Sequence, residues 1–342
     1  MDDADVIDDK ILPLINELIQ KSGGTENSFE VDLIRQQIQN SLKLLTEGHN
    51  KGQLKLMTRA LKEMRYAYRI FNDYPDSRRV SIFGSARTPE DHPEYKAAEE
   101  FSRALAKHGW MCITGAANGI MKAGMAGISQ DNRFGLSIRL PFEVPTNRFL
   151  EGDPKLIHFR YFFTRKLMFM SHSDAVAVFP GGYGTMDELF EMLTLIQTGK
   201  GAIVPIVLLE GPEGVYWDHW DTYVRTNLLK GGRIGFEDRS FYYIAPSIDK
   251  AIDHIEQFYR KYHSSRYVKE LCVIRLKSSL SEKSVELLNE KFSRLVRSGK
   301  IQMSEALAEE NELLELPRLI FHHTRADFSL LRQMIDQINL LD

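Results

Sequence analysis

The sequence has little cysteine and no long apolar run, and each shortage excludes a class of protein. Cys112 and Cys272 are the only two cysteines among 342 residues, too few for a disulfide framework. No CxxC pair or His/Cys cluster indicates a zinc site. No apolar run approaches the roughly 18 residues that a membrane span requires. We therefore expect a cytoplasmic protein in a reducing environment, without a membrane partner.

An excess of charge of one sign is also missing. Lys and Arg number 44 against 47 Asp and Glu, which gives a formal net charge of −3. No global basic field favours nucleic acid as a partner, and no acidic excess indicates a solvated tail. The first residues, MDDADVIDDK, lack the basic and apolar zones of a signal peptide. The length predicts two domains, or one large domain with additions.

The chain divides into three parts by the spacing of its apolar residues. Residues 1–75 have helical periodicity and predict a helical N-terminal extension, with helices near 7–18, 28–45 and 52–71. Four basic residues lie along the third helix, where they form either a solvated face or a contact with a partner subunit. They are Arg59, Lys62, Arg65 and Arg69.

The middle part, residues 76–264, alternates strands and helices. Short apolar runs predict strands, and several of them end in glycine. Repeated strand–helix units of this kind predict an α/β fold with an open, doubly wound parallel sheet. Ligands bind such sheets beyond the carboxyl ends of the strands. The expected strands are 80–83, 110–114, 134–140, 175–179 and 203–208, and the expected helices are 94–108, 120–130, 163–171, 185 onward, 217–229 and 247–262.

The third part, residues 265–342, predicts a small α+β C-terminal module. Its expected order is strand, helix, strand, strand and helix, which resembles the ferredoxin-like arrangement of many regulatory modules. The expected strands are 271–276, 301–306 and 316–322, and the expected helices are 282–296 and 327–341.

The stretch from Ala175 to Leu195 combines a buried strand, a glycine-rich turn and a helix that we expect to begin at Thr185. The glycines allow positive φ and a close approach of the backbone to a ligand. Thr185 is the expected helix cap, and the acids that follow, Asp187 and Glu188, are expected in the first turn. The free N–H groups of such a turn form an anion site suited to phosphate.

Two common phosphate motifs do not match this turn. The dinucleotide fingerprint G-x-G-x-x-G, started at Gly182, requires glycine at the position of Asp187. A P-loop requires lysine before its Ser or Thr, and Gly184 stands before Thr185 instead. A tight turn without a ligand is a further alternative. It is disfavoured because three strands of one sheet end in glycine.

Three motifs in order resemble one known family. Pro180 to Glu188 reads PGGYGTMDE and matches the pattern P-G-G-x-G-T-x-x-E. The run from Arg165-Lys166 to Asp174 and the strand end at Ile82–Ala86 also fit. Over roughly residues 75–262, the chain resembles the Rossmann-like family of the plant "lonely guy" cytokinin-activating enzymes. In its length it resembles the larger bacterial members of that family. Many members carry the label "lysine decarboxylase", although no pyridoxal phosphate site is visible here.

The resemblance implies a nucleoside 5′-monophosphate phosphoribohydrolase, which releases free base and ribose 5-phosphate without a metal or organic cofactor. It implies that Glu188 and Arg165 are the catalytic pair. Glu188 would stabilise an oxocarbenium-like ribose and orient water. Arg165 would hold that carboxylate or contact the departing base. The expected substrate-binding residues are Gly84, Ser85, Gly115, Asn118, Gly119, Glu143, Lys166, Gly181, Gly182, Tyr183, Gly184, Thr185, Asp187 and Thr194.

Several features depart from the short members of the family. The second glycine loop reads Gly115-Ala116-Ala117-Asn118-Gly119 where the short members more often have a glycine triplet. The flanking regions favour purine or pyrimidine monophosphates over a cytokinin riboside monophosphate as substrate. An effector nucleotide could act through the C-terminal module. A nucleotide-binding sensor without turnover is the alternative function, and a homodimer or larger homo-oligomer is expected.

Overall fold

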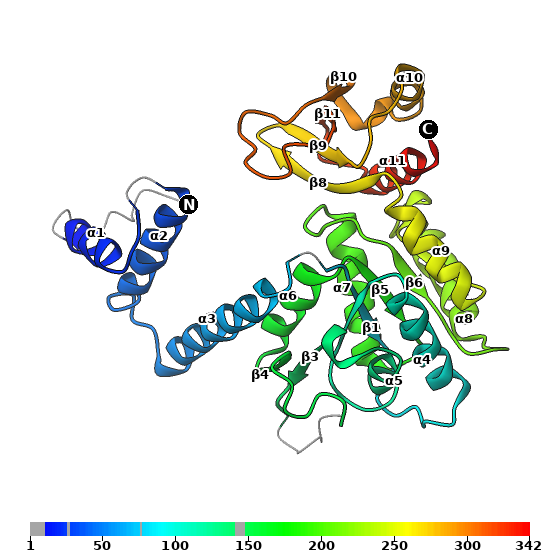
Figure 1. Ribbon diagram of the computed structural model, residues 1–342, viewed down its shortest axis with the longest axis horizontal. Helices are drawn as coiled ribbons and strands as arrows, with labels where there is room; N and C mark the ends of the chain where they lie inside the picture. The colour runs from blue at the N-terminus through cyan, green and yellow to red at the C-terminus, as the bar shows by residue number, and fades with distance from the viewer. Residues whose placement is uncertain (1–10, 26–27, 76, 141–147) are drawn as a thin grey trace. The chain divides into compact units, whose positions relative to one another are not determined.

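The structure is a computed structural model that describes residues 11–25, 28–75, 77–140 and 148–342. It consists of two compact units, Met1–Arg65 and Tyr66–Asp342. The elements of both units are labelled in Figure 1.

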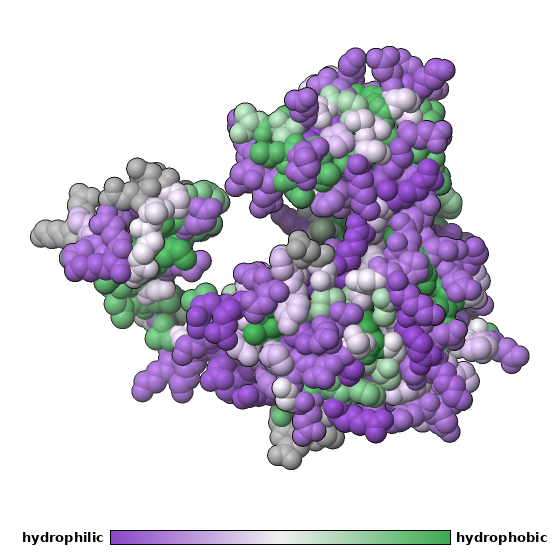
Figure 2. Space-filling view, viewed as in Figure 1, coloured by the Kyte–Doolittle hydropathy of each residue, from purple (hydrophilic) through white to green (hydrophobic). Residues whose placement is uncertain are grey.

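The first unit is helical, as its periodicity predicts. It contains α1 (Ile11–Lys21), α2 (Phe29–Lys43) and most of α3 (Lys51–Asn72), which continues into the second unit. Ser28 caps α2 by accepting a hydrogen bond from the N–H of Val31 at 3.2 Å. The basic side chains along α3 are exposed. Apolar side chains are exposed as well, visible as green patches on this unit in Figure 2, and they include Leu14, Leu18, Phe29, Leu33, Ile34 and Leu45.

The second unit is built on a parallel sheet with the strand order β4-β3-β2-β1-β5-β6-β7. This order confirms the prediction of a doubly wound α/β fold, because the chain runs outward in one direction from β1 and in the other direction from β5. The strands are β1 (Arg79–Phe83), β2 (Met111–Thr114), β3 (Arg133–Ile138), β4 (Leu156–Phe159), β5 (Ala175–Val178), β6 (Ile206–Leu208) and β7 (Tyr242–Ile244).

The two edge strands, β4 and β7, are absent from the expected elements. β4 has an exposed residue among its four, and all three residues of β7 are only half-buried. Neither therefore presents the continuous apolar run that marks the central strands of a parallel sheet. By contrast, β1, β2 and β5 are buried at every position, and each was predicted from its sequence.

Helices cover this sheet on both sides. α4 (Pro93–Ala106) packs against α5 (Ile120–Ala126) and against α9 (Ile248–Phe258). α6 (Phe162–His172) contacts β3 and β4. α5 ends four residues earlier than expected, and Gly127 is its C-cap. A side chain at position 127 would collide with the carbonyl oxygen of Glu99, which explains the glycine there. The remaining helices of this part are α7 (Tyr183–Gln197) and α8 (Tyr216–Tyr223).

A second, antiparallel sheet lies in the C-terminal part of this unit, with the order β10-β11-β9-β8. β8 (Tyr262–Val268) was not expected, so the order is strand, strand, helix, strand, strand, helix, and the predicted sequence of elements was incomplete. β8 was missed because five of its seven residues are half-buried or exposed. The other elements are β9 (Leu271–Leu276), α10 (Glu282–Lys291), β10 (Val296–Ser304), β11 (Arg318–His323) and α11 (Phe328–Leu340).

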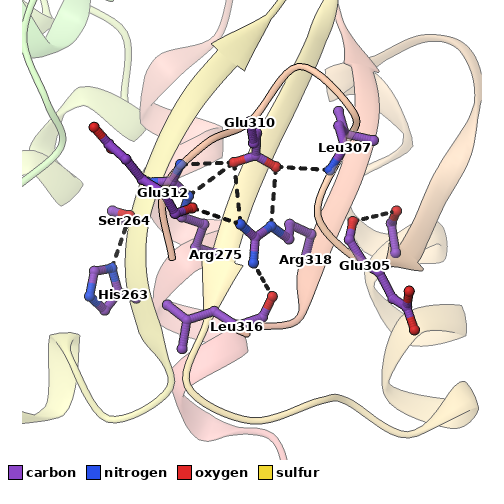
Figure 3. A network of polar contacts seen from close by, with 10 residues as sticks. His263, Ser264, Arg275, Glu305, Leu307, Glu310, Glu312, Leu316 and Arg318 are labelled. Atoms are coloured by element: carbon purple, nitrogen blue, oxygen red, sulfur yellow. Dashed lines mark hydrogen bonds and ion pairs between the residues drawn. The ribbon is translucent and has the colours of Figure 1, made fainter. Parts of the chain in front are cut away.

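A buried carboxylate joins two strands of this sheet. Arg275 on β9 and Arg318 on β11 are register partners, and both donate to Glu310, which lies in the connection between β10 and β11 (Figure 3). The N–H of Leu307 also donates to Glu310 at 3.2 Å. Burial alone would raise the pKa of Glu310, but the hydrogen bonds from Arg318 and Arg275 lower it to about 2. The carboxylate therefore neutralises two adjacent cations and holds the connecting segment on the sheet.

Neither cysteine takes part in a disulfide, since Cys112 and Cys272 are buried and free. Within the described ranges, no helix has the length and apolar character to cross a membrane.

Candidate functional site

A cavity of about 880 Å³ opens at the carboxyl ends of β1, β2 and β5. It is lined by Gly84 and Ser85 after β1, by Gly115 after β2, and by residues 181–186 and Glu188 after β5. The three glycine loops therefore meet, as expected from a parallel sheet. β1 and β5 are the strands between which the chain reverses direction, the place where open α/β sheets bind ligands.

Close packing explains the glycine at position 181. A Cβ atom added there would lie 2.1 Å from Thr185 Oγ1 and 3.0 Å from the backbone nitrogen of Ser85. A Cβ on Gly182 would meet no atom within 4 Å. The turn does not use the positive φ that its glycines allow, since Gly182 has φ of −92° and neither Gly181 nor Gly184 has positive φ. These glycines serve close approach and open space instead.

The helix after the turn begins two residues earlier than expected. Gly182 is the N-cap of α7, and Thr185 is a buried residue of the first turn rather than the cap. Asp187 and Glu188 consequently lie in the second turn, and the first turn contains no acid. The reason is that the backbone of the glycine loop itself enters the helix, so the first N–H groups of α7 adjoin the cavity without a capping side chain.

The first and third loops are joined through their backbones. The N–H of Ser85 donates to the carbonyl oxygen of Pro180 at 3.0 Å. The N–H of Ile120 donates to the carbonyl oxygen of Ser85, also at 3.0 Å. Gly119 permits the second contact, since a Cβ there would lie 2.2 Å from Ser85 O. The three loops therefore form one connected rim.

Arg165 and Glu188 face one another in this cavity. Arg165 Nη2 on α6 lies 3.8 Å from Glu188 Oε1 on α7, and both side chains are largely buried. Arg165 Nε and Glu188 Oε2 are buried and have no hydrogen-bond partner among the described residues. Buried polar atoms are ordinarily paired, so these two atoms are available to a substrate or to water.

The environment of Glu188 changes its acidity. Burial raises the pKa of its carboxyl to about 7, against the opposing charges of Arg165 and Lys166. A carboxyl with a pKa near neutrality can exchange a proton with water or with a leaving group. Burial also lowers the pKa of Arg165, whereas the charge of Glu188 raises it.

Lys166 forms ion pairs with two acidic residues on α7. Its Nζ lies 2.8 Å from Asp187 Oδ1 and 3.0 Å from Glu191 Oε2. Adjacent residues of α6 thus pair with adjacent residues of α7, Arg165 with Glu188 and Lys166 with Asp187. This double pairing links α6 to α7 through their side chains next to the cavity.

The structure brings most, but not all, of the expected site residues together. Tyr183, Gly184 and Thr185 line the cavity with the residues named above. Lys166 and Asp187 pair with each other and do not line the cavity, and Gly119 packs against Ser85 in the rim. Asn118 and Thr194 are exposed and do not line the cavity. Glu143 lies outside the described residues.

Other lining residues were not expected from the sequence. Arg87 lies two residues beyond Ser85, and its N–H donates to Ser85 Oγ at 3.1 Å. Phe162 lies one turn before Arg165, whose guanidinium is 5.3 Å from the ring centroid. Arg87, a basic residue four positions after the end of β1, could have been noticed in the sequence, but the apolar lining residues are scattered along the chain. It comprises Phe83, Met121, Ile138, Leu140, Phe162 and Phe169.

No group of three or more His, Cys, Asp or Glu side chains that could hold a metal ion occurs within the part of the chain that is described.

A doubly wound sheet with a glycine loop and a helix N-terminus at its switch point defines an α/β protein with a cavity where open sheets of this class bind ligands. The family model described as "possible lysine decarboxylase" matches residues 114–255. This match confirms the resemblance inferred from the motifs, for the segment that carries Arg165 and Glu188. No curated protein sequence matches the chain.

Several solved structures are similar to about half of the chain. The molybdenum cofactor carrier protein from Chlamydomonas reinhardtii is 19% identical, with 53% of this chain and 96% of that chain covered and a TM-score of 0.37. TM1055, a structural genomics target, is 23% identical over 53% of this chain and 99% of that chain, with a TM-score of 0.39. DNA processing protein A from Helicobacter pylori is 18% identical over 52% and 79%, with a TM-score of 0.35.

Proposed function

We propose that the chain hydrolyses the N-glycosidic bond of nucleoside 5′-monophosphates and releases free base and ribose 5-phosphate. The observation that carries this proposal is Glu188, a buried carboxyl with an unpaired oxygen and a pKa of about 7 in the cavity of the glycine loop. The family match over residues 114–255 supports it.

The glycine loop and the start of α7 form the proposed binding site for the 5′-phosphate. Gly182 and Gly184 line the cavity, a Cβ on either would meet no atom within 4 Å, and the helix N-terminus places N–H groups beside them. A dianionic phosphate at this point interacts favourably with the helix dipole and accepts several N–H bonds. Arg87 adds a positive charge at the same rim.

Glu188 then lies one helical turn beyond Gly184, beside the expected position of the ribose. As C1′–N cleaves, its electron pair leaves with the base and positive charge develops at C1′. The Glu188 carboxylate stabilises that charge and accepts a proton from the water that adds to C1′. The departing base takes up a proton from solvent, so that one water is consumed for each base released. Arg165 holds the Glu188 carboxylate or contacts the departing base, and the apolar part of the lining accommodates the base.

The test is direct incubation with AMP, GMP, CMP and UMP, with assay of free base and ribose 5-phosphate. Glu188→Gln preserves shape and removes the charge, and we expect kcat to fall by at least about 10²-fold. Glu286→Gln, an exposed residue of α10, is the matched control. Full activity of Glu188→Gln would exclude the mechanism. Tight nucleotide binding with no base release by the unmodified chain would instead favour the nucleotide sensor.

We further propose that α6 and α7 pair with a second copy of the chain, as the family resemblance implies. Phe163, Leu167 and Phe190 lie on these helices and are 51%, 42% and 37% exposed. Apolar side chains of this size favour burial at an interface. Light scattering after size exclusion tests this, and a monomeric chain would contradict it.

A further inference from the structure

The carbonyl group of Gly181, in the middle of the glycine loop, is held by a residue that does not line the cavity. Tyr216 Oη donates a hydrogen bond to Gly181 O at 2.7 Å, and the same hydroxyl lies 3.5 Å from Met186 Sδ. Tyr216 is the first residue of α8. It therefore reaches the loop from the next strand–helix connection along the chain.

Tyr216 is itself held in place. Its N–H donates to Glu210 Oε2 at 2.8 Å, in the connection between β6 and α8. Its ring packs edge-on against the fully buried Trp217, with centroids 4.9 Å apart. The hydroxyl is thus delivered to Gly181 by a rigid support rather than by a mobile side chain.

This hydrogen bond determines the direction of an N–H group. In a trans peptide the C=O and the following N–H point in opposite directions, so anchoring Gly181 O toward α8 turns the N–H of Gly182 away from α8. Gly182 lines the cavity. The preceding carbonyl, Pro180 O, is held in the same way by the N–H of Ser85 at 3.0 Å. Successive peptide planes of the loop are therefore anchored from outside.

An external anchor matters here because glycine peptides rotate more freely than any others. We propose that Tyr216 is a positioning residue that orients the Gly182 N–H toward the phosphate group of the substrate. This inference rests on the proposed function, in which the cavity binds a nucleoside 5′-monophosphate. Tyr216 touches no substrate atom and acts only through the Gly181–Gly182 peptide.

The test compares the full-length chain with its Tyr216→Phe variant, which loses one hydroxyl and keeps the ring. Ribose 5-phosphate is the phosphorylated probe and adenosine the probe without phosphate. We expect the Kd of ribose 5-phosphate to rise about five- to tenfold, as for one lost hydrogen bond. The KM for AMP should rise by a similar factor, with kcat and adenosine inhibition changed less than about twofold. Tyr223→Phe, an exposed tyrosine of the same helix, is the control.

The outcomes separate the inference from the proposed function. An unchanged Kd of ribose 5-phosphate in Tyr216→Phe would overturn the positioning role and leave the proposed function standing. An equal loss of affinity for ribose 5-phosphate and adenosine would indicate general loosening of the loop and would also overturn it. If the unmodified chain bound no ribose 5-phosphate, the proposed function itself would fail.

Discussion

Arg165 Nη2 and Glu188 Oε1 lie 3.8 Å apart in a largely buried setting, too far for a direct hydrogen bond. The charge of Arg165 therefore lowers the pKa of Glu188 without a direct hydrogen bond to its carboxylate. Oε2 is left without a partner among the described residues. This geometry leaves Oε2 free to contact a reacting group in the cavity, and nearby charges act on the protonation of Glu188.

The pH dependence of the reaction follows from the pKa of Glu188. Burial raises it to about 7, so the carboxylate is the minor form below that pH and the major form above it. Because the proposal assigns catalysis to the carboxylate, kcat/KM should rise with pH through about 7 and level off above it. Initial rates of base release between pH 5 and pH 9 measure this. A profile that falls through pH 7 would mean that Glu188 acts as an acid.

Two substitutions should move this profile in opposite directions. Lys166 lowers the pKa of Glu188 and Asp187 raises it. Lys166→Met removes the cation and leaves Asp187 unneutralised, so the apparent pKa should rise. Asp187→Asn removes the anion and leaves the positive charge of Lys166 less neutralised, so the apparent pKa of Glu188 should fall. For removal of one charge near a buried carboxyl, the midpoint of the pH profile should move by about 0.5 to 1 pH unit. Equal profiles would show that Glu188 does not control the rate.

The glycines of the loop should respond differently to alanine. Gly181→Ala places a Cβ 2.1 Å from Thr185 Oγ1, so we expect a loss of about 1–3 kcal/mol in unfolding free energy. Gly182→Ala meets no atom within 4 Å and should leave stability unchanged. Its methyl group faces open space at the cavity, so substrate affinity should fall instead. Denaturant unfolding and KM measured side by side test the contrast, and equal stability of both variants would contradict it.

Glu310 is expected to matter for stability. Glu310→Gln leaves Arg318 buried without a neutralising charge and Arg275 with only the exposed Glu312 carboxylate, 4.0 Å away. We expect a loss of about 3 kcal/mol in unfolding free energy. Glu309→Gln, which breaks the exposed pair with Lys269, should leave the unfolding free energy nearly unchanged. Urea unfolding of the two variants checks this ordering.

The same carboxylate predicts an acid sensitivity. Its folded pKa of about 2 lies below the roughly 4.3 of an unfolded Glu, so it stabilises the fold fully above that unfolded value. The contribution is lost as the pH falls from about 4.3 toward 2. The stability difference between the unmodified chain and Glu310→Gln should therefore shrink below pH 4. A difference that stays constant would show that the charge of Glu310 is not responsible.

The central strands and the glycine loop could be predicted from the sequence because their signals are local. A strand buried on both faces is an uninterrupted apolar run, and Ala175–Val178 is one. The edge strands β4 and β7 and the half-exposed β8 have no such run, because their pairing depends on neighbours distant in the chain. The helix start after Gly182 was misplaced because no capping side chain marks it.

The residue types and spacing from Pro180 to Glu188 determined by themselves that the chain carries a glycine loop with an acid close behind it. Only the tertiary structure decided what surrounds them. Strand order places β1 beside β5, so Ser85 and Pro180 meet although 95 residues separate them. Folding buries Glu188 beside Arg165 of α6 and raises its pKa, and it brings Tyr216 of α8 to Gly181. Local sequence encodes backbone conformation, whereas burial, charge proximity and hydrogen bonds between distant segments arise only when the sheet has assembled.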